Sequence, residues 1–516
     1  MPVVTRPSPL LPAFAGVASV ALAAGAGELV AGLVAPASSP FAAVGGALID
    51  LAPSWAKDTA IALFGTSDKI ALLVGIGIVA AILAAGAGVL EARRPPWGRF
   101  LVLAIGIGGA IVAATRPDSS VASWFPAALA GAIGAISIRY LARSAVRSQE
   151  VASRTDEGPA DPGRRGFFVW AGALTATGVV LAIAGSAVRA GAQAVTAARD
   201  AIRLPTPASR APAVAAGAEL GIDGLTPVIT PNADFYRIDT ALVVPQVSTS
   251  DWSLRIHGMV EQEVTITWDE LLALPLEESI TTLTCVSNEV GGDLIGNAVW
   301  LGYPIRELLA RARPSADADM VLSRSIDGFT ASSPIEALTD ERDAILAVGM
   351  NGEPLPTEHG FPVRMVVPGL YGYVSATKWV TELEVTRFDA ATSYWTDRGW
   401  SERGPIKLES RIDVPRRSAS LSAGDTVIAG VAWQQHVGVS GVEVQIDDGE
   451  WQQATLASAI SDDTWVQWSL PWQAASGTHR LTVRATNADG ETQTPDRADV
   501  VPDGATGWHS VEVSVR

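Results

Sequence analysis

Cysteine is nearly missing from this 516-residue sequence, which holds a single one, Cys285. One thiol cannot form an internal disulfide, and it cannot complete the CxxCH motif that attaches a c-type haem. Histidine is also scarce, with five residues of which the first is His257. The apolar first 200 residues therefore carry no histidine or cysteine that could hold a haem within a membrane.

Positive charge is in deficit as well. Lysine and arginine number 37 against 54 aspartates and glutamates, a formal net charge of −17. A protein that binds nucleic acid needs a basic surface that displaces counterions from the phosphates. The composition therefore excludes nucleic acid as a partner.

The composition changes sharply near residue 200. Up to that point Ala, Gly, Val, Leu and Ile dominate, and later residues are mixed and acidic, so the mean hydropathy of +0.26 averages two parts. A bilayer core of ~30 Å requires a helix of ~20 apolar residues. We expect five spans, of which the third is short, and hence an all-α transmembrane bundle over residues 1–192. The five runs are 13–34, 70–90, 100–114, 121–141 and 167–188.

Arginine distribution predicts the orientation of these spans. Arginines gather between the second and third spans and again, from Arg139 to Arg165, between the fourth and fifth. Positively charged loops stay in the cytoplasm. The N-terminus is therefore expected inside, which makes the chain a multi-pass plasma-membrane protein whose soluble half is extracytoplasmic.

Two features of the membrane half leave alternatives open. Arg164-Arg165-Gly166-Phe167-Phe168 resembles a twin-arginine export signal, although a positive-inside anchor would look the same. Glu28 is the one acid well inside a span. Such residues favour a proton or quinone site, but Glu28 could equally lie near the outer interface.

The soluble half begins after a linker over residues 193–220 that ends in a Pro-rich stretch. Residues 252–258 alternate apolar and polar side chains as a half-buried strand does. A short helix begins at Thr267-Trp268-Asp269, with either the threonine or the aspartate as its cap. From residue 418 to 516, short alternating strands are separated by Asp-Gly turns, which predicts an all-β immunoglobulin-like sandwich.

Cys285 lies after a β-type run and before Gly291-Gly292. Three interpretations remain for this thiol. It can be a small buried hydrophobe, a nucleophile paired with a histidine such as His359 in a hydrolase, or a thiolate ligand to a soft or high-valent metal.

Three motifs favour the third interpretation. They are TLTCVSNEVGG around Cys285, MNGEPLPTEHGFPVRMVVPG over 350–369 and SATKWV over 375–380. In this order they resemble the sulfite oxidase family of molybdopterin enzymes, and the resemblance runs from about residue 226 to the C-terminus. It implies an α+β molybdopterin-binding catalytic domain over 221–417 and a dimerisation domain over 418–516.

The resemblance also implies a site. Cys285 would ligate molybdenum, and Arg364 and Lys378 would lie near the phosphate of an anionic pterin, which needs cations and hydrogen-bond donors. The cofactor would be molybdenum-molybdopterin. The implied cofactor-binding residues are Tyr236, Arg237, Asp239, Cys285, His359, Arg364, Ala376, Thr377 and Lys378.

The sequence departs from the family in two places. Sulfite oxidases carry an arginine shortly after the cysteine, where this chain has Val286, Ser287, Asn288 and Glu289. They also carry a tyrosine two residues before the Met-Asn-Gly turn, where this chain has Val348. A site with an acid in place of a cation repels sulfite, so we expect a neutral or cationic small-molecule substrate such as a sulfoxide or N-oxide.

The expected function is oxygen-atom transfer by a membrane-anchored, outward-facing molybdopterin oxidoreductase. No domain that accepts electrons is evident in the sequence, so a separate membrane or periplasmic carrier, a cytochrome or quinone, is expected, together with a possible homodimer. The alternative is a non-catalytic exported envelope or binding protein on the same fold.

Overall fold

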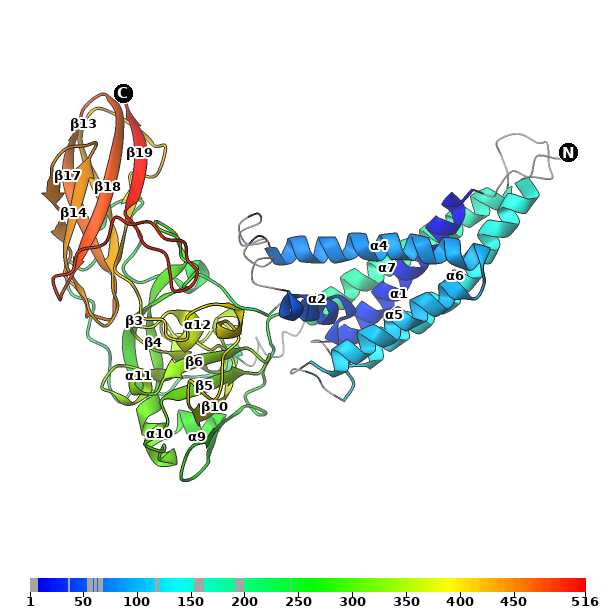
Figure 1. Ribbon diagram of the computed structural model, residues 1–516, viewed down its shortest axis with the longest axis horizontal. Coiled ribbons are helices and arrows are strands. Elements are labelled where there is room, and N and C mark those ends of the chain that lie inside the picture. The colour runs from blue at the N-terminus through cyan, green and yellow to red at the C-terminus, as the bar shows by residue number, and fades with distance from the viewer. Residues whose placement is uncertain are drawn as a thin grey trace. The chain divides into compact units, whose positions relative to one another are not determined.

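The computed structural model describes residues 8–35, 38–52, 59, 63, 68–116, 119, 121–152, 162–190, 199–241 and 243–516 (Figure 1). The chain divides into two compact units. One comprises Met1–Thr196 with Thr240–Pro245, and the other comprises Ala197–Asp239 with Gln246–Arg516.

The first unit is a helical bundle. Its helices are α1 (Leu10–Val34), α2 (Pro40–Leu51), α4 (Asp68–Arg93), α5 (Trp97–Ala114), α6 (Phe125–Ala152) and α7 (Pro162–Ala190). Five helical segments in the described residues are long and apolar enough to cross a membrane, as the sequence predicts: Leu10–Val34, Ile70–Arg93, Trp97–Ala114, Phe125–Gln149 and Arg165–Val188. The sequence reasoning missed α2, a shorter apolar helix.

Helix α1 packs against α4, α6 and α7. Small residues make this approach possible, since a Cβ added to Gly25 would lie 1.9 Å from the carbonyl oxygen of Gly178 on α7. The outer face of α4 is apolar and open, with Val74, Ile78 and Ile82 exposed by 56%, 57% and 66%. The bundle thus buries small residues and presents large apolar ones outward, as membrane helices do.

Glu28 is buried within α1. Its carboxylate accepts hydrogen bonds from the Ser39 hydroxyl at 2.7 Å and from the Phe41 amide at 3.3 Å. Ser39 is the N-cap of α2, and a carboxylate there meets the positive end of the helix dipole. Glu28 therefore joins α1 to α2, and its role as a proton or quinone site stays a prediction.

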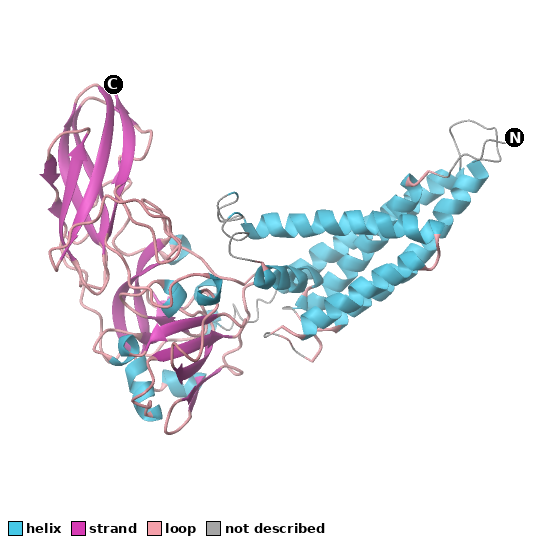
Figure 2. Cartoon of the chain, viewed as in Figure 1, coloured by secondary structure: helices cyan, strands magenta, loops and turns pink. Residues whose placement is uncertain are grey.

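The second unit contains two sheets followed by a β sandwich; its strands are magenta in Figure 2. The first sheet has the order β2-β1-β10-β5-β6, and the second has the order β3-β4-β7-β8 with β9 paired to β7. Their strands are β1 (Ser253–Gly258), β2 (Val264–Thr267), β3 (Glu277–Thr284), β4 (Ile295–Pro304), β5 (Met320–Ser325), β6 (Thr330–Pro334), β7 (Ile345–Met350), β8 (Glu353–Pro354), β9 (Arg364–Val366) and β10 (Val380–Thr386).

Short helices connect these strands. They are η3 (Asn232–Asp234), α9 (Trp268–Leu272), α10 (Ile305–Ala312), α11 (Glu336–Thr339), η4 (Thr357–His359), α12 (Gly372–Ser375) and η5 (Thr396–Arg398). The predicted half-buried strand and the predicted cap are both confirmed. Strand β1 alternates in burial, and Thr267 forms a capping box with Glu270 at the start of α9.

The C-terminal region is a sandwich of two sheets, with the orders β11-β13-β17-β16 and β12-β19-β18-β14-β15. Its strands are β11 (Glu409–Val414), β12 (Ser420–Leu421), β13 (Gly424–Trp433), β14 (Val439–Ile446), β15 (Trp451–Gln453), β16 (Thr455–Leu456), β17 (Val466–Ala474), β18 (Gly477–Asn487) and β19 (His509–Val515). Ile428 and Trp468 from one sheet share a core with Val444, Leu481 and Val513 from the other. The α+β region and the all-β sandwich agree with the predicted fold class.

Residues 199–209, expected to belong to a linker, pack on the second unit. Arg199 donates to the carbonyl oxygens of Leu355 at 2.8 Å and Pro354 at 2.6 Å. Ser209 pairs with Glu277 in a parallel bridge at the start of β3. The boundaries predicted for the domains stay predictions, but this part of the expected linker is held against the sheet that leads to Cys285.

Candidate active site

Cys285 immediately follows β3 and begins a tight turn. Its amide donates to the Leu294 carbonyl at 2.9 Å, and its carbonyl accepts from the Asn288 amide at 3.0 Å. The Asn288 side chain closes the turn, because its Oδ1 accepts from the Leu294 amide at 2.8 Å. The thiol is free and buried. We call this segment, residues 285–294, the cysteine turn.

The cysteine turn does not activate its thiol as a nucleophile. Burial raises the pKa of Cys285, although hydrogen bonds from Ser287 and the charge of Lys378 oppose that rise. A nucleophilic cysteine needs a lowered pKa and a base within hydrogen-bond reach. Among the described residues, no hydrogen bond joins Cys285 to His359, whose Nε2 lies 3.2 Å from the carbonyl oxygen of Asn232. This arrangement does not support the Cys-His hydrolase.

Arg364, at the start of β9, is a buried cation with an unusual set of partners. Its guanidinium donates to three carbonyls, those of His359 at 3.1 Å, Met365 at 3.3 Å and Ala376 at 3.5 Å. It also lies over the Trp300 ring, 5.1 Å from the centroid. Burial lowers its pKa to about 10. Within the described part of the chain no carboxylate pairs with it, so its charge is free to bind an anionic ligand.

Lys378 lies in the same region but has an acidic partner. Its Nζ is 2.8 Å from Asp239 Oδ2 and 3.1 Å from the carbonyl oxygen of Glu358. Burial lowers its pKa to about 8, against the opposing charge of Asp239. Asp239 also pairs with Arg237, whose Nε lies at 2.9 Å and whose side chain is 40% exposed. These residues form a charged rim that extends from the interior to the surface.

Gly360 brings the two buried cations together. Its φ is +112°, and an added Cβ would lie 3.0 Å from the Cβ of Arg364 and 3.2 Å from that of Lys378. His359, at the end of η4, is held beside them. Burial, reinforced by the charges of Arg364 and Lys378, lowers the pKa of His359 to about 4, so the imidazole is neutral. A neutral ring 3.2 Å from the Asn232 carbonyl donates from Nε2 and leaves Nδ1 as an acceptor.

The other predicted site residues differ in the hydrogen-bonding groups that they present. The Tyr236 phenol has a raised pKa because it is buried and close to Cys285, with Arg364 opposing, so it stays protonated. Ala376 contributes its carbonyl to Arg364. Thr377 is fully buried, and its hydroxyl lies 2.7 Å from that of Ser323. The Thr377 hydroxyl is thus bonded within the fold, and its cofactor contact stays a prediction.

Sequence reasoning missed the residues that reach β3 and the cysteine turn from the sandwich. Gln435 donates to the Thr282 carbonyl at 3.1 Å and to the Thr284 hydroxyl at 2.9 Å. Arg411 donates to the Gly292 carbonyl at 2.7 Å. Glu409 accepts from Asn288 Nδ2 at 3.4 Å. No local pattern marks these residues, since each lies more than a hundred positions from its partner.

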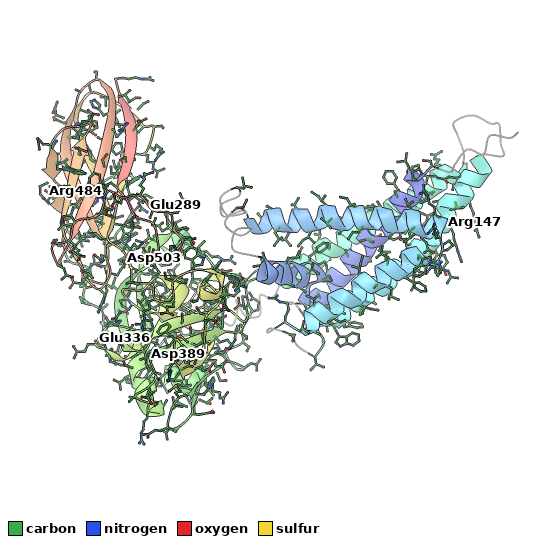
Figure 3. All side chains as sticks on the ribbon, viewed as in Figure 1. Arg147, Glu289, Glu336, Asp389, Arg484 and Asp503 are labelled. Carbon is green, nitrogen blue, oxygen red and sulfur yellow. The ribbon has the colours of Figure 1, made fainter. Side chains whose placement is uncertain are left out.

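The acid that follows Cys285 in the sequence is not the one that lies beside it in space. Glu289 is exposed (Figure 3). Glu409, from β11, is the buried carboxyl next to the cysteine turn. Val348, at the position of the missing tyrosine, is fully buried in β7. The acid found beside the cysteine turn is therefore Glu409 and not Glu289.

Comparison with known proteins agrees with the site. Residues 241–395 match the family described as Oxidoreductase molybdopterin binding domain. The chain is 28% identical over 345 residues to the mitochondrial sulfite oxidase of Mus musculus, covering 56% of this chain and 62% of that protein. It is 31% identical over 153 residues to the Uncharacterized oxidoreductase YuiH of Bacillus subtilis (strain 168), covering 30% of this chain and 74% of that protein.

A solved structure shows the shared fold. The sulfane dehydrogenase SoxCD from Paracoccus pantotrophus superposes with a TM-score of 0.50 at 22% identity, over 57% of this chain and 85% of that one. The residues found here fit a molybdenum-pterin group, because the buried guanidinium of Arg364 has no carboxylate partner among the described residues and the free thiol of Cys285 can ligate a metal. The chain belongs to the sulfite oxidase-like family of molybdopterin oxidoreductases, and molybdenum bound to molybdopterin is its cofactor.

Proposed function

We propose that this protein is a membrane-anchored enzyme that transfers an oxygen atom to or from a small molecule. The observation that carries this proposal is the pairing of a free buried thiol, Cys285, with a buried guanidinium, Arg364, that has no carboxylate partner in the described residues. The thiol provides one ligand for a metal and the guanidinium provides charge for an anionic pterin.

Each side chain has a separate part in holding the cofactor. Cys285 ligates molybdenum, and Arg364 and Lys378 bind the anionic portion of the pterin. His359, neutral and fixed by Asn232, presents Nδ1 as an acceptor, while the protonated Tyr236 phenol can donate a hydrogen bond. Ala376 and Thr377 contribute backbone groups. Arg237 and Asp239 form the outer rim. When bound, the cofactor supplies the two-electron redox centre of the reaction.

The substrate we propose is neutral or cationic. Relatives are named for sulfite oxidation, sulfane dehydrogenation and nitrate reduction, and a sulfite site needs free positive charge. Here Lys407 and Arg411, the two cations that act on the buried Glu409, are neutralised by Asp503 at 2.8 Å and Asp413 at 2.6 Å. Small sulfoxides and N-oxides carry no net charge, so they can bind without the unpaired cation that sulfite requires.

The electron route we propose runs through a separate carrier. A cytochrome or a quinone in or beside the membrane would exchange single electrons with the site. The apolar helices would anchor the chain, with the catalytic region outside the cytoplasm because the arginine-rich loops stay within it. A homodimer through the sandwich follows from the family resemblance.

Metal analysis tests the proposal directly. The full chain is expressed in a host with an intact molybdopterin pathway, purified in detergent, and assayed for molybdenum by mass spectrometry and for pterin by fluorescence after oxidation. We expect about one molybdenum per wild-type chain, because there is one thiolate ligand. Cys285→Ala should lose the metal, and Arg364→Gln should lose both metal and pterin.

Arg324→Gln is the matched control, since Arg324 is 44% exposed and pairs with Glu382 away from the site. It should retain wild-type metal and pterin. A wild-type protein that contains no molybdenum would overturn the proposal and favour a non-catalytic binding protein. Metal retained at wild-type occupancy by Cys285→Ala would contradict the assigned ligand.

A further inference from the structure

Glu409 is a buried acid that forms no ion pair with any residue in the described part of the chain. Its side chain lies at the start of β11 and the residue is 3% exposed. Its one described side-chain hydrogen bond comes from Asn288 Nδ2, at 3.4 Å. The nearby cations Lys407 and Arg411 are bound to Asp503 and Asp413. An isolated carboxylate is costly to bury, so such a group either holds a proton or faces a ligand.

The position of Glu409 connects it to the metal-binding cysteine. Asn288, its hydrogen-bond partner, belongs to the cysteine turn and donates its amide to the Cys285 carbonyl at 3.0 Å. The amide oxygen of the same side chain accepts from Leu294 at 2.8 Å, so the Asn288 side chain cannot rotate away. Glu409 is thereby held beside the turn that would carry the metal.

Tyr371 is a third protonatable group in this region. It is buried, and its pKa is raised by burial and then by the charge of Glu409, with smaller effects from Asp503 and Cys285. The backbone amide of Lys407 donates to its hydroxyl at 3.4 Å. Tyr371, Glu409 and Cys285 are all buried, so the phenol, the carboxyl and the thiol are all poorly solvated.

The charged groups around Glu409 do not force it to ionise. Lys407 and Arg411 favour the carboxylate, but their own aspartates offset them, and Tyr371 is neutral. Burial therefore dominates and raises the pKa of Glu409 to about 8. A carboxyl that can hold or release a proton near neutral pH is suited to general acid-base work.

We propose that Glu409 is the proton-exchanging residue of the active site. This inference rests on the proposed function. In the oxidative direction, substrate and water give the oxygenated substrate, two protons and two electrons. A bond would form between the substrate and the water oxygen, both O–H bonds would break, and the electron pair would leave to the two-electron redox centre that the cofactor supplies when bound. One proton passes to the Glu409 carboxylate and the other to solvent. In the reductive direction the oxygen that leaves the substrate takes one proton from Glu409 and one from solvent, and two electrons from the separate carrier, to form water.

Infrared difference spectroscopy of the full, molybdenum-loaded chain tests this proposal without turnover. Spectra are recorded before and after reduction with dithionite, for wild type, Glu409→Gln and the control Glu443→Gln. Glu443 pairs with Arg484 in the sandwich, away from the cysteine turn. A carboxyl band that changes on reduction in wild type and Glu443→Gln, and is absent in Glu409→Gln, supports the proposal.

A kinetic measurement complements the spectra. With a panel of small sulfoxides and N-oxides and a reduced viologen as electron donor, Glu409→Gln should retain its molybdenum but lose about 10²-fold or more in kcat. Its pH profile should also lose the ionisation seen in wild type. A reduction-induced carboxyl change that persists in Glu409→Gln, or that is absent in wild type, would overturn the proposal. Lack of metal or of turnover in wild type would instead count against the proposed function.

Discussion

The ammonium of Lys378 and the carboxylate of Asp239 form an ion pair of 2.8 Å in which both side chains are almost enclosed, at 10% and 4% exposure. The pair connects two segments 139 residues apart in the sequence. Since Arg364 lies beside it without a carboxylate partner among the described residues, the site holds more buried positive charge than its own acids neutralise. That surplus is what an anionic cofactor would balance.

Replacing Asp239 with Asn should therefore weaken both the fold and cofactor retention. The change leaves Lys378 buried without its counter-charge, and breaking a buried ion pair from one side costs about 3 kcal/mol of unfolding free energy. Denaturant unfolding of the cofactor-free chain measures the stability, and pterin content after purification measures retention. Asp389→Asn, which removes an exposed partner of Arg387, should change neither. Equal pterin content in Asp239→Asn and wild type would contradict this account.

Gly360→Ala should be more damaging than the same change at another glycine of positive φ. At Gly360 the new Cβ meets Arg364 and Lys378 at 3.0 and 3.2 Å, and φ is +112°. At Gly399, φ is +93° but the structure shows nothing within 4 Å of an added Cβ. Both variants suffer backbone strain of about 1–2 kcal/mol, and only Gly360→Ala should also lose pterin. The thermal midpoints of the two variants report the backbone strain that they share, and the loss of pterin in Gly360→Ala alone reports the crowding of Arg364 and Lys378.

Glu409 should make stability fall as pH rises. Its pKa increases from an ordinary 4.5 to about 8 in the folded chain. Between these two pKa values the folded chain keeps the proton on Glu409, while the unfolded chain has released it. The contribution of Glu409 to the free energy of unfolding is therefore complete below the lower pKa and is lost as the pH rises through the upper one. The difference in unfolding free energy between wild type and Glu409→Gln should shrink by up to about 1.4 kcal/mol per pH unit.

Denaturant midpoints at several pH values across this window check the slope. Contributions from His359 and Lys378 occur in both proteins and cancel in the difference. A difference that is independent of pH would mean that Glu409 does not bind a proton on folding. A difference in unfolding free energy that grows with pH would mean that folding lowers the pKa of Glu409 and does not raise it. That result would show that the buried carboxylate is paired.

Gln435→Ala should loosen the strand that leads to Cys285. Its side chain gives two hydrogen bonds to Thr282 and Thr284 of β3 and is 2% exposed. Removing these two hydrogen bonds should lower the free energy of unfolding by about 1–2 kcal/mol, because it leaves buried acceptors unsatisfied. We expect lower molybdenum occupancy as well as a lower thermal midpoint. Gln445→Ala, which removes a surface bond to Gly449, is the control. Unchanged occupancy in Gln435→Ala would show that β3 holds its position without the sandwich.

The sequence predicts features that depend on local patterns. The five spans follow from runs of apolar residues, and the cap at Thr267 and the alternation in β1 follow from a few neighbouring side chains. Cys285, His359, Arg364 and Lys378 could be named because they lie in short motifs. The structure brings these residues into one region, as the resemblance implies.

The contacts between the sandwich and the cysteine turn could not be predicted in this way. Glu409, Ser410 and Arg411 look like an exposed polar strand, yet all three are buried. Their burial depends on partners such as Asn288, which lies 121 residues before Glu409. The bond between the Thr377 and Ser323 hydroxyls could not be predicted either, because it requires β5 and the 375–380 motif to be placed first.

Arg164 and Arg165, near the start of α7, distinguish the two interpretations of this segment, an export signal or a positive-inside anchor. A twin-arginine signal depends on the arginines themselves, whereas the positive-inside rule counts lysine and arginine alike. Arg164→Lys with Arg165→Lys preserves charge, so an anchor should keep its topology and an export signal should fail. Protease added to spheroplasts should digest the soluble half of wild type and of an Arg143→Lys control. If the signal is used, the double variant should be protected; digestion equal to wild type would show that these arginines act by charge alone.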